Sequence, residues 1–299
     1  MEIVINGVSG WIGRSTVHAV NRLFKNQIVH LTGISSRNTL IAVDGIKEFP
    51  TVTVDQYLDG YKKEPDVYVH LPFKTKDYQV KFCPEDYIQI NRALIEKGLE
   101  VISRTKPKSV IIVSSGVVGR FKESQGLKDD DLYTKMKIQE EESFQSLCLR
   151  QGINLVTLRL WGASGYLMTE PLKYAIGDLV AQALQDPVIK ISSDRLVYRR
   201  YIDASEVMSV SLICAQNGFS GVLNSGGTVV EMMELTERIL SILGQSKEIV
   251  RPPLTQTVPD LYFSTSTVFE EQARKFGLEL SNLEKQILQT KIAVLRSLK

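Results

Sequence analysis

Residues 2–13, EIVINGVSGWIG, decide the fold that this sequence predicts. The apolar run at residues 3–5 indicates a short strand, and the glycines at positions 7, 10 and 13 follow it at once. Residues 15–24, STVHAVNRLF, then place apolar side chains at helical spacing. A strand, a glycine-rich turn and a helix in this order predict the first unit of a nucleotide-binding α/β sheet.

Each glycine has its own expected role in this turn. Gly7 permits the tight turn, Gly10 lets the backbone approach a pyrophosphate, and Gly13 lets the helix and the strand pack closely. The helix then begins near Trp11 and Ile12, and its free N–H groups face the phosphates. We therefore predict that these five residues bind a dinucleotide cofactor.

Strands and helices continue to alternate along the first half of the chain. Apolar runs predict strands at residues 28–34, 66–72, 109–115 and 153–160. Helices are predicted from Pro84 to a stop at Gly98, and from Tyr133 to about Arg150. This alternation predicts an α/β fold, a doubly wound parallel sheet of the Rossmann type.

After Trp161 the alternation becomes irregular. The pattern predicts a strand at residues 197–202 and helices at residues 174–185, 205–215, 229–243, 268–276 and 283–298. We expect a nucleotide-binding domain over residues 1–160 and a smaller C-terminal substrate lobe over residues 161–299. A segment around residues 195–215 is expected to return to the first domain.

Composition excludes several classes of protein. The formal net charge is +2, so no broad surface for nucleic acid or anionic lipid is expected. No apolar stretch approaches the roughly 20 residues that span a bilayer. The first strand begins at Glu2, which predicts no signal peptide and a cytoplasmic protein. The cysteines and histidines lack metal-ligand spacing, so no metal site is predicted; they are Cys83, Cys148, Cys214, His18, His30 and His70.

Tyr133 and Lys137 form the most informative pair of polar residues. Positions four apart lie on one face of a helix, about 5–6 Å apart at Cβ. An ammonium group there favours ionisation of the phenol, whose ordinary pKa is about 10. A phenol held in this way can exchange a proton with a carbonyl or an alcohol. Together with the glycine turn, the pair predicts nicotinamide redox chemistry.

With these motifs the sequence resembles the extended short-chain dehydrogenase/reductases, the family of nucleotide-sugar epimerases, dehydratases and reductases. The resemblance covers nearly the whole chain. Besides the glycines, Tyr133 and Lys137, it rests on the motifs Val69-His70-Leu71, Asn91, residues 113–119, residues 158–162, residues 199–204, residues 223–227 and residues 276–278.

The resemblance implies a role for each of these positions. Tyr133 would be the catalytic acid or base, and Lys137 would hold the nicotinamide ribose while lowering the pKa of the tyrosine. Ser114 would hydrogen-bond the reacting oxygen, with Ser115 as its alternate. Leu71 would contact the cofactor. Arg199, with Arg200 as its alternate, would bind the diphosphate of a nucleotide sugar, and the family commonly forms homodimers through the helices of Asn91 and Tyr133.

The sequence departs from the usual pattern after the second strand. An NAD-preferring site usually places an acidic residue there, whereas this chain has Ser35, Ser36 and Arg37. Hydroxyls and a guanidinium suit a 2′-phosphate, which a carboxylate would repel. We therefore predict NADP as the cofactor, with NAD as the alternative.

Three functions remain open from the sequence. The leading hypothesis is an NADP-dependent reductase of a 4-keto nucleotide sugar. Dehydration is disfavoured, because Ser115-Gly116 stands where the related dehydratases carry an Asp-Glu pair. The alternatives are a nucleotide-sugar 4-epimerase that retains its cofactor, and a non-catalytic NADP-binding regulator.

Overall fold

The computed structural model describes residues 1–43 and 45–298. The chain divides into two compact units. The first contains residues 1–160 and 208–223; the second contains residues 161–207 and the segment that begins at Asn224. The part of the chain that returns to the first unit therefore starts later than the predicted segment around residues 195–215.

An eight-stranded sheet forms the centre of the first unit, in the order β11-β7-β6-β5-β1-β2-β4-β3. Six neighbouring strands from β7 to β4 pair in parallel, and β3 pairs antiparallel with β4. This sheet confirms the predicted α/β fold. Its strands are β1 (Glu2–Asn6), β2 (His30–Ile34), β3 (Leu40–Val43), β4 (Ile46–Val52), β5 (Val67–His70), β6 (Ser109–Ser115), β7 (Asn154–Leu160) and β11 (Gly221–Asn224).

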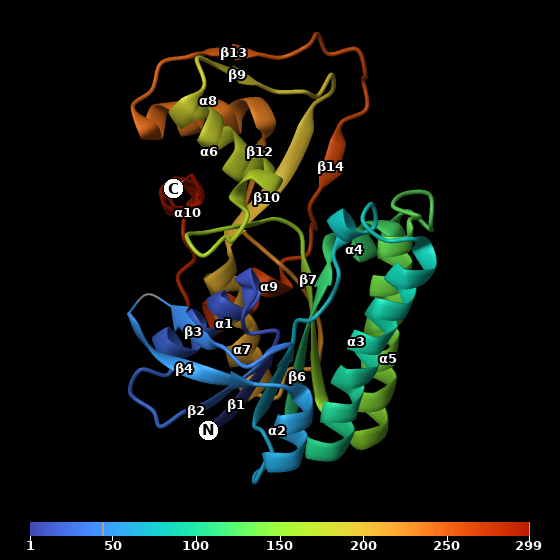
Figure 1. The fold of residues 1–299 in the computed structure, drawn as a ribbon. Helices are drawn as coiled ribbons and strands as arrows, with labels where there is room; N and C mark the ends of the chain where they lie inside the picture. The colour runs from blue at the N-terminus through green and yellow to red at the C-terminus, as the bar shows by residue number, and fades with distance from the viewer. Residues whose placement is uncertain (44, 299) are drawn as a thin grey trace. The chain divides into compact units, whose positions relative to one another are not determined.

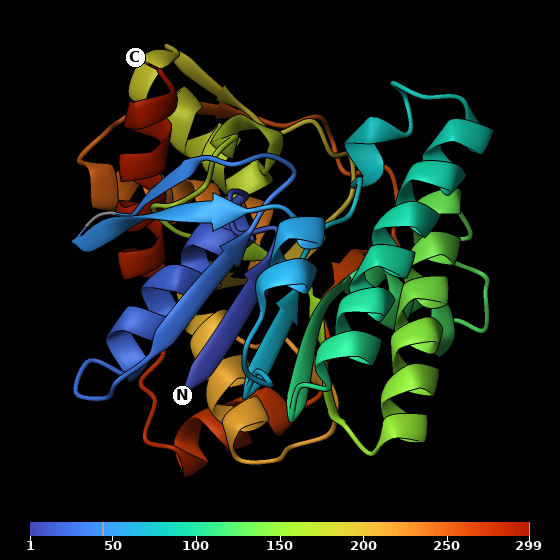
Figure 2. The same cartoon turned by 60° about the horizontal axis from the view of Figure 1, so that its bottom comes forward.

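Helices cover both faces of this sheet, and Figures 1 and 2 show α3 and α5 side by side along one of them. Tyr68 of β5, Tyr87 of α3 and Phe144 of α5 are fully buried in the core beneath these two helices. The helical elements of the unit are α1 (Trp11–Leu23), α2 (Val54–Gly60), η1 (Lys76–Tyr78), α3 (Pro84–Thr105), α4 (Gly116–Glu123), α5 (Leu132–Gln151) and most of α7 (Ala204–Gln216).

Helix α3 does not end where the sequence predicts. It continues for seven residues beyond Gly98, to Thr105. A Cβ atom at Gly98 would lie 2.5 Å from Cε1 and Nδ1 of His70. The glycine is therefore present because β5 and α3 approach closely, and the predicted helix stop is wrong.

Parallel pairing brings the predicted site residues to one edge of the sheet. Asn6, at the end of β1, pairs with Ile34 of β2 and with His70 of β5. His70 in turn pairs with Ile112 of β6. The glycine turn, Ser35 and Leu71 follow these strands, and Ser114 and Ser115 end β6, so all lie at the carboxyl edge, where nucleotides bind to such sheets.

The second unit has smaller sheets and its own core. Strand β10 pairs with β12, β14 and β8, and β9 pairs with β13. Residues 229–231, predicted as the start of a helix, belong to β12, so that prediction is wrong. The elements are β8 (Ala163–Ser164), η2 (Pro171–Lys173), α6 (Ala175–Gln185), β9 (Val188–Lys190), β10 (Val197–Asp203), β12 (Thr228–Glu231), α8 (Met232–Leu243), β13 (Glu248–Val250), β14 (Asp260–Tyr262), α9 (Val268–Lys275) and α10 (Leu283–Ser297).

Candidate active site

The glycine turn joins β1 to α1 with backbone packed against backbone. Gly7 has a φ of +85°, which favours glycine, and its N–H donates to the Ile34 carbonyl at 2.9 Å. A Cβ atom at Gly13 would lie 2.5 Å from the Gly7 carbonyl oxygen and 2.6 Å from two backbone atoms of Val8. A Cβ atom at Gly10 would meet only the Gly7 oxygen, at 3.6 Å. Glycine is therefore needed at positions 7 and 13 for the conformation and packing of the turn, whereas at Gly10 the space outside the turn is open.

The N-terminus of α1 has the properties of an anion site. Gly10 is its N-cap residue, and within the described residues no side chain caps this helix end. The first turn of α1, at Trp11 and Ile12, carries no acidic residue. The N–H groups and the positive end of the helix dipole attract phosphate at a helix N-terminus. These residues fit the diphosphate of a nicotinamide dinucleotide.

The three residues after β2 that were predicted to bind the cofactor, Ser35, Ser36 and Arg37, have different surroundings. Ser35 is buried, and its hydroxyl donates to the Arg37 carbonyl and lies 2.9 Å from the Thr51 hydroxyl. Ser35 therefore shapes the turn. Ser36 and Arg37 are exposed after the turn, so their side chains can meet a ligand from solvent.

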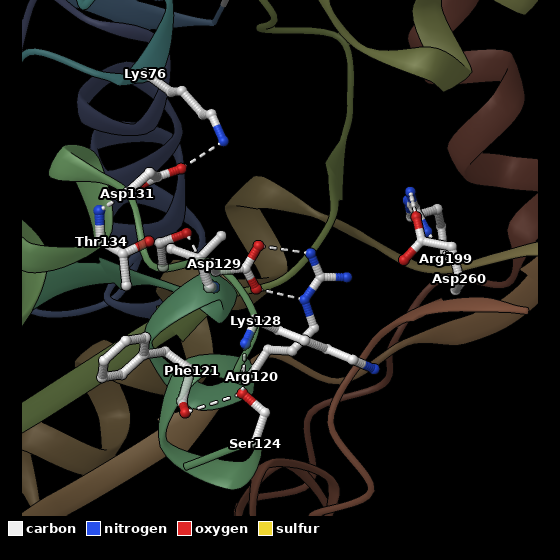
Figure 3. A network of polar contacts seen from close by, with 12 residues as sticks. Lys76, Arg120, Phe121, Ser124, Lys128, Asp129, Asp131, Thr134, Arg199 and Asp260 are labelled. Atoms are coloured by element: carbon white, nitrogen blue, oxygen red, sulfur yellow. Dashed lines mark hydrogen bonds and ion pairs between the residues drawn. The ribbon is translucent and has the colours of Figure 1, made fainter. Parts of the chain in front are cut away.

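Tyr133 lies in the first turn of α5, and the start of this helix is firmly held. Asp131 is the N-cap residue, because its carboxylate accepts the Thr134 N–H at 2.9 Å. The same carboxylate accepts a hydrogen bond of 2.6 Å from Lys76, in the segment before α3 (Figure 3). Two bonds at the N-cap fix where α5 begins and hence where the phenol lies.

The surroundings of Tyr133 keep its phenol protonated. The side chain is half-buried, with the Phe73 ring against it at 5.9 Å between centroids and an interplanar angle of 80°. Burial raises the pKa of Tyr133 to about 12, and the charge of Glu140 adds to the rise, although a hydrogen bond with Ser115 lowers it. The phenol is therefore a proton donor at neutral pH.

The Lys137 ammonium group is buried and makes three contacts. It donates to the Val113 carbonyl at 2.9 Å and to the Glu140 carboxylate at 2.7 Å. It also lies 3.8 Å from the centre of the Phe73 ring, a cation–π distance. Only 4% of Lys137 is exposed. The sequence motif predicts a lysine that acts on the tyrosine directly, whereas here the ammonium is half of an ion pair.

The structure separates the roles of the two serines of β6. The Ser114 hydroxyl donates to Glu141 at 2.7 Å, and only 3% of the residue is exposed. Glu141 also accepts two hydrogen bonds from Arg159, at 2.9 and 2.7 Å. Ser115, by contrast, bonds the Tyr133 phenol. Ser114 is thus bonded to Glu141, whereas its alternate Ser115 lies beside the phenol, and a role of either serine at the reacting oxygen stays a prediction.

The segment after β5 is anchored to α3. The Asn91 side chain accepts the Lys74 N–H at 2.8 Å, and the Tyr87 hydroxyl donates to the Lys74 carbonyl at 2.7 Å. Leu71 lies against the glycine turn, 3.1 Å from the position of a Cβ atom at Gly7. These contacts hold Phe73, which lies between Leu71 and Lys74 in the chain, beside Tyr133 and Lys137.

Glu140 and Phe73 are the two site residues that sequence reasoning missed. Glu140 follows Tyr133 by seven residues and Lys137 by three, so helical periodicity places all three on one face of α5. That spacing was a usable signal. Nothing in the sequence indicates that the Phe73 ring covers a lysine.

In the second unit, Arg199 and Arg200 have different roles. Arg199 donates to the Asp260 carboxylate at 2.6 Å and is partly exposed (Figure 3). It lines a cavity of about 370 Å³ together with residues that include Asp178, Lys190 and Ser193. Arg200 donates to the Gly227 and Ser264 carbonyls at 3.0 and 2.8 Å and to the Glu270 carboxylate. Both arginines are bonded to protein groups, but Arg199 and not Arg200 lines the cavity, so the diphosphate role stays a prediction with Arg199 as the better placed of the two.

Two kinds of site are absent from the part of the chain that the structure describes. It contains no group of three or more His, Cys, Asp or Glu side chains that could hold a metal ion. None of its helices combines the length and the apolar composition that a membrane crossing requires.

Solved structures from three organisms share this fold over nearly their whole length. The UDP-glucose 4-epimerase of Thermotoga maritima, solved with UDP-glucose, is 19% identical, with a TM-score of 0.75 and full coverage of both chains. RMD from Pseudomonas aeruginosa, solved with NADPH, is 18% identical, with a TM-score of 0.73 and 99% coverage of each chain. The dTDP-glucose 4,6-dehydratase of Bacillus anthracis, solved with NAD, is 16% identical, with a TM-score of 0.73 and coverage of 99% of this chain and 97% of that one.

Comparison with curated protein sequences gives no match. The model of the NAD dependent epimerase/dehydratase family matches residues 3–226, which include the glycine turn, Tyr133, Lys137 and Arg199. The family resemblance seen in the sequence is confirmed, and with it an enzyme that uses a nicotinamide dinucleotide. The chain belongs to the NAD dependent epimerase/dehydratase family.

Proposed function

We propose that this enzyme is an NADP-dependent reductase of a 4-keto nucleotide sugar, with Tyr133 as the proton donor. The observation that carries the proposal is the Tyr133 phenol, half-buried at the start of α5 with the Phe73 ring against it. Reduction of a ketone requires a proton donor, whereas epimerisation must begin by removing a proton from an alcohol. A pKa of about 12 for Tyr133, with the Ser115 hydroxyl beside it, favours donation.

The proposed reaction converts a carbonyl group to a secondary alcohol. When bound, the reduced cofactor supplies a hydride to the carbonyl carbon. Tyr133 donates its proton to the carbonyl oxygen as negative charge develops there, and the Ser115 hydroxyl stabilises that charge. Lys137, held by the Val113 carbonyl and Glu140, maintains a cationic group in the same site.

The proposed preference for NADP rests on the segment after β2. The exposed Arg37 offers a guanidinium to a 2′-phosphate, and Ser36 offers a hydroxyl. Ser35, at the position of the acidic residue in NAD-preferring sites, is uncharged and bonded within its own turn. A 2′-phosphate thus meets no carboxylate at this position of the chain.

The proposed substrate class rests on Arg199 and its cavity. A partly exposed guanidinium beside a cavity can bind a diphosphate, which would compete with Asp260 for the same donors. The structure of the Thermotoga maritima epimerase contains UDP-glucose, which shows that this fold accommodates a nucleotide sugar. Dehydration is disfavoured because α4, which begins directly after Ser115, has no acidic residue in its first turn.

The test is incubation of the purified protein with NADPH and a panel of keto and non-keto nucleotide sugars. A reductase oxidises NADPH with the ketones alone. Interconversion of sugars without net NADPH consumption would instead show a 4-epimerase that retains its cofactor. Binding of NADPH without turnover on any sugar would show a non-catalytic regulator. A homodimer through α3 and α5 also remains a prediction, which sedimentation tests.

A further inference from the structure

A nearly buried ion pair in the second unit is bonded to the wall of the cavity that Arg199 lines. Arg251, which follows β13, donates to the Glu231 carboxylate at 2.9 Å, and the two side chains are only 8% and 11% exposed. The proposed reaction uses neither residue. Burial of a charged pair costs free energy unless its remaining donors and acceptors are bonded, so the other partners of the pair show what it holds.

Arg251 holds the loop between β9 and β10. Its Nε donates to the Ser193 carbonyl at 3.1 Å, and one of its terminal nitrogens donates to the Arg195 carbonyl. The Ser193 hydroxyl donates to the same Arg195 carbonyl at 3.0 Å, and Ser193 is one of the residues that line the cavity. Because the guanidinium carries several donors in a fixed fork, it makes the ion pair and both loop bonds at once, which an ammonium group cannot do.

Glu231 holds two further parts of the cavity wall. It is the N-cap residue of α8, where one carboxylate oxygen accepts the Met233 N–H at 2.6 Å. Its other oxygen accepts the N–H of Val197, the first residue of β10, at 3.0 Å. Val197 and Met232, which follows Glu231 in the chain, both line the cavity. Burial alone would raise the pKa of Glu231, but these N–H donors and Arg251 lower it, so the carboxylate is ionised at neutral pH.

We propose that Arg251 is a positioning residue for the substrate, which holds the loop before β10, the start of β10 and the start of α8 in place around the cavity beside Arg199. The hydrogen bonds of Arg251 and Glu231 carry the proposal, because each of them ends on a loop, strand or helix that forms the cavity wall. The identity of the ligand, the nucleoside diphosphate part of a nucleotide sugar, rests on the proposed function.

The physical reason is the cost of ordering a binding site. A cavity built from separate segments loses affinity if a loop must be ordered when the ligand binds, whereas walls that are already fixed keep the full gain from their contacts. Arg251 is not one of the residues that line the cavity, and it acts only through the carbonyls and the carboxylate that it binds. Its loss should therefore weaken substrate binding and leave the chemical step unchanged.

The test is the affinity of the purified protein for a nucleoside diphosphate, measured by calorimetry with UDP, GDP, CDP and dTDP in turn. Arg251→Lys keeps a positive charge beside Glu231 but lacks the donors for both loop carbonyls. We expect its dissociation constant for the tightest of these diphosphates to rise roughly tenfold, the effect of one or two lost hydrogen bonds, while that for NADPH changes little. An unchanged affinity for the diphosphate would overturn the proposal.

Ile287→Val is the matched control for a general loss of stability. Ile287 of α10 is fully buried in the core of the second unit and does not line the cavity. Loss of its methyl group should lower the melting temperature while the affinity for the diphosphate stays near that of the wild type. An equal loss of affinity in Ile287→Val and Arg251→Lys would mean that any destabilisation of the second unit weakens binding, and it would overturn the proposal.

A double variant covers the case in which Arg251→Lys does not fold. Arg251→Met combined with Glu231→Gln removes both charges, and such neutral replacements of a buried pair are often tolerated. It should bind the diphosphate at least as weakly as we expect of Arg251→Lys, and wild-type affinity would contradict the role of Arg251.

Kinetics with a keto nucleotide sugar that the wild type reduces provide a second readout. In Arg251→Lys the KM for the sugar should rise by the same factor as the dissociation constant, while kcat stays within about twofold. A fall in kcat at an unchanged KM would overturn the positioning role. A wild type that binds no nucleoside diphosphate would overturn the proposed substrate class together with this proposal, whereas equal binding by the wild type and Arg251→Lys would overturn this proposal alone.

Discussion

Gly13→Ala should lower the stability of the protein because the new methyl group has no room. Its Cβ atom would lie 2.5 Å from the Gly7 oxygen, whereas ordinary contacts begin at 3.4 Å, so the turn or α1 must move by about 0.9 Å. The turn resists this movement, since the N–H groups of Gly7 and Val8 both donate to the Ile34 carbonyl. Overpacking of this kind costs about 1–3 kcal/mol.

Gly10→Ala is the matched control for this prediction. Gly10 has an ordinary φ of −75°, and the contact of its Cβ atom would be 3.6 Å. Alanine there should leave the free energy of unfolding within about 0.5 kcal/mol of the wild type, as at other unstrained positions. It should nevertheless weaken NADPH binding, because the methyl group occupies the open side of the turn.

Thermal unfolding and fluorescence titration with NADPH measure the two effects separately. Gly13→Ala should unfold roughly 2–10 °C below the wild type, and Gly10→Ala should match the wild-type melting temperature but bind NADPH less tightly. The reasoning is refuted if Gly13→Ala melts with the wild type, or if Gly10→Ala loses as much stability as Gly13→Ala.

Three further predictions follow from the same geometry. Gly98→Ala should cost about 1–3 kcal/mol in chemical denaturation, because the methyl group would press on the His70 ring; an unchanged midpoint would contradict this packing. Glu141→Gln should cost about 3–5 kcal/mol by leaving the Arg159 charge, whose side chain is only 12% exposed, without its carboxylate. Burial alone would raise the pKa of Glu141, but the Arg159 charge lowers it below 4.5. The stabilisation that the wild type gains from the ionised Glu141 should therefore be lost as the pH falls below about 4.5, whereas Glu141→Gln should show no such loss. Arg37→Ala should weaken binding of NADPH more than that of NADH in parallel titrations, and equal losses would argue against a 2′-phosphate contact.

The sequence predicted five strands of the eight-stranded sheet, β1, β2, β5, β6 and β7, because their signals are local. A buried parallel strand is a nearly continuous apolar run, as at residues 110–113 of β6, and the glycine turn follows its strand directly. The placing of Tyr133 and Lys137 in one helix, four residues apart, also depends only on local sequence. Such features need no knowledge of which distant segments pack together.

The errors occur where a distant contact decides the outcome. Glycine at position 98 is typical of a helix end, but here it is needed because the His70 ring, twenty-eight residues earlier in the chain, leaves no room for a side chain. Residues 229–231 adjoin the helical pattern of α8, but their two valines suit a strand, and β10 pairs with them. Neighbouring serines alternate across β6, so only the positions of Glu141 and Tyr133 decide that Ser115 and not Ser114 meets the phenol.

The most direct test of the proposed chemistry is the rate of NADPH oxidation by Tyr133→Phe, with a keto nucleotide sugar that the wild type reduces. Removing the hydroxyl takes away the proton donor but leaves the glycine turn and Lys137 in place. We predict that turnover falls by at least about 100-fold while the dissociation constant for NADPH changes little. Turnover at the wild-type rate would contradict the assignment of Tyr133 as the acid.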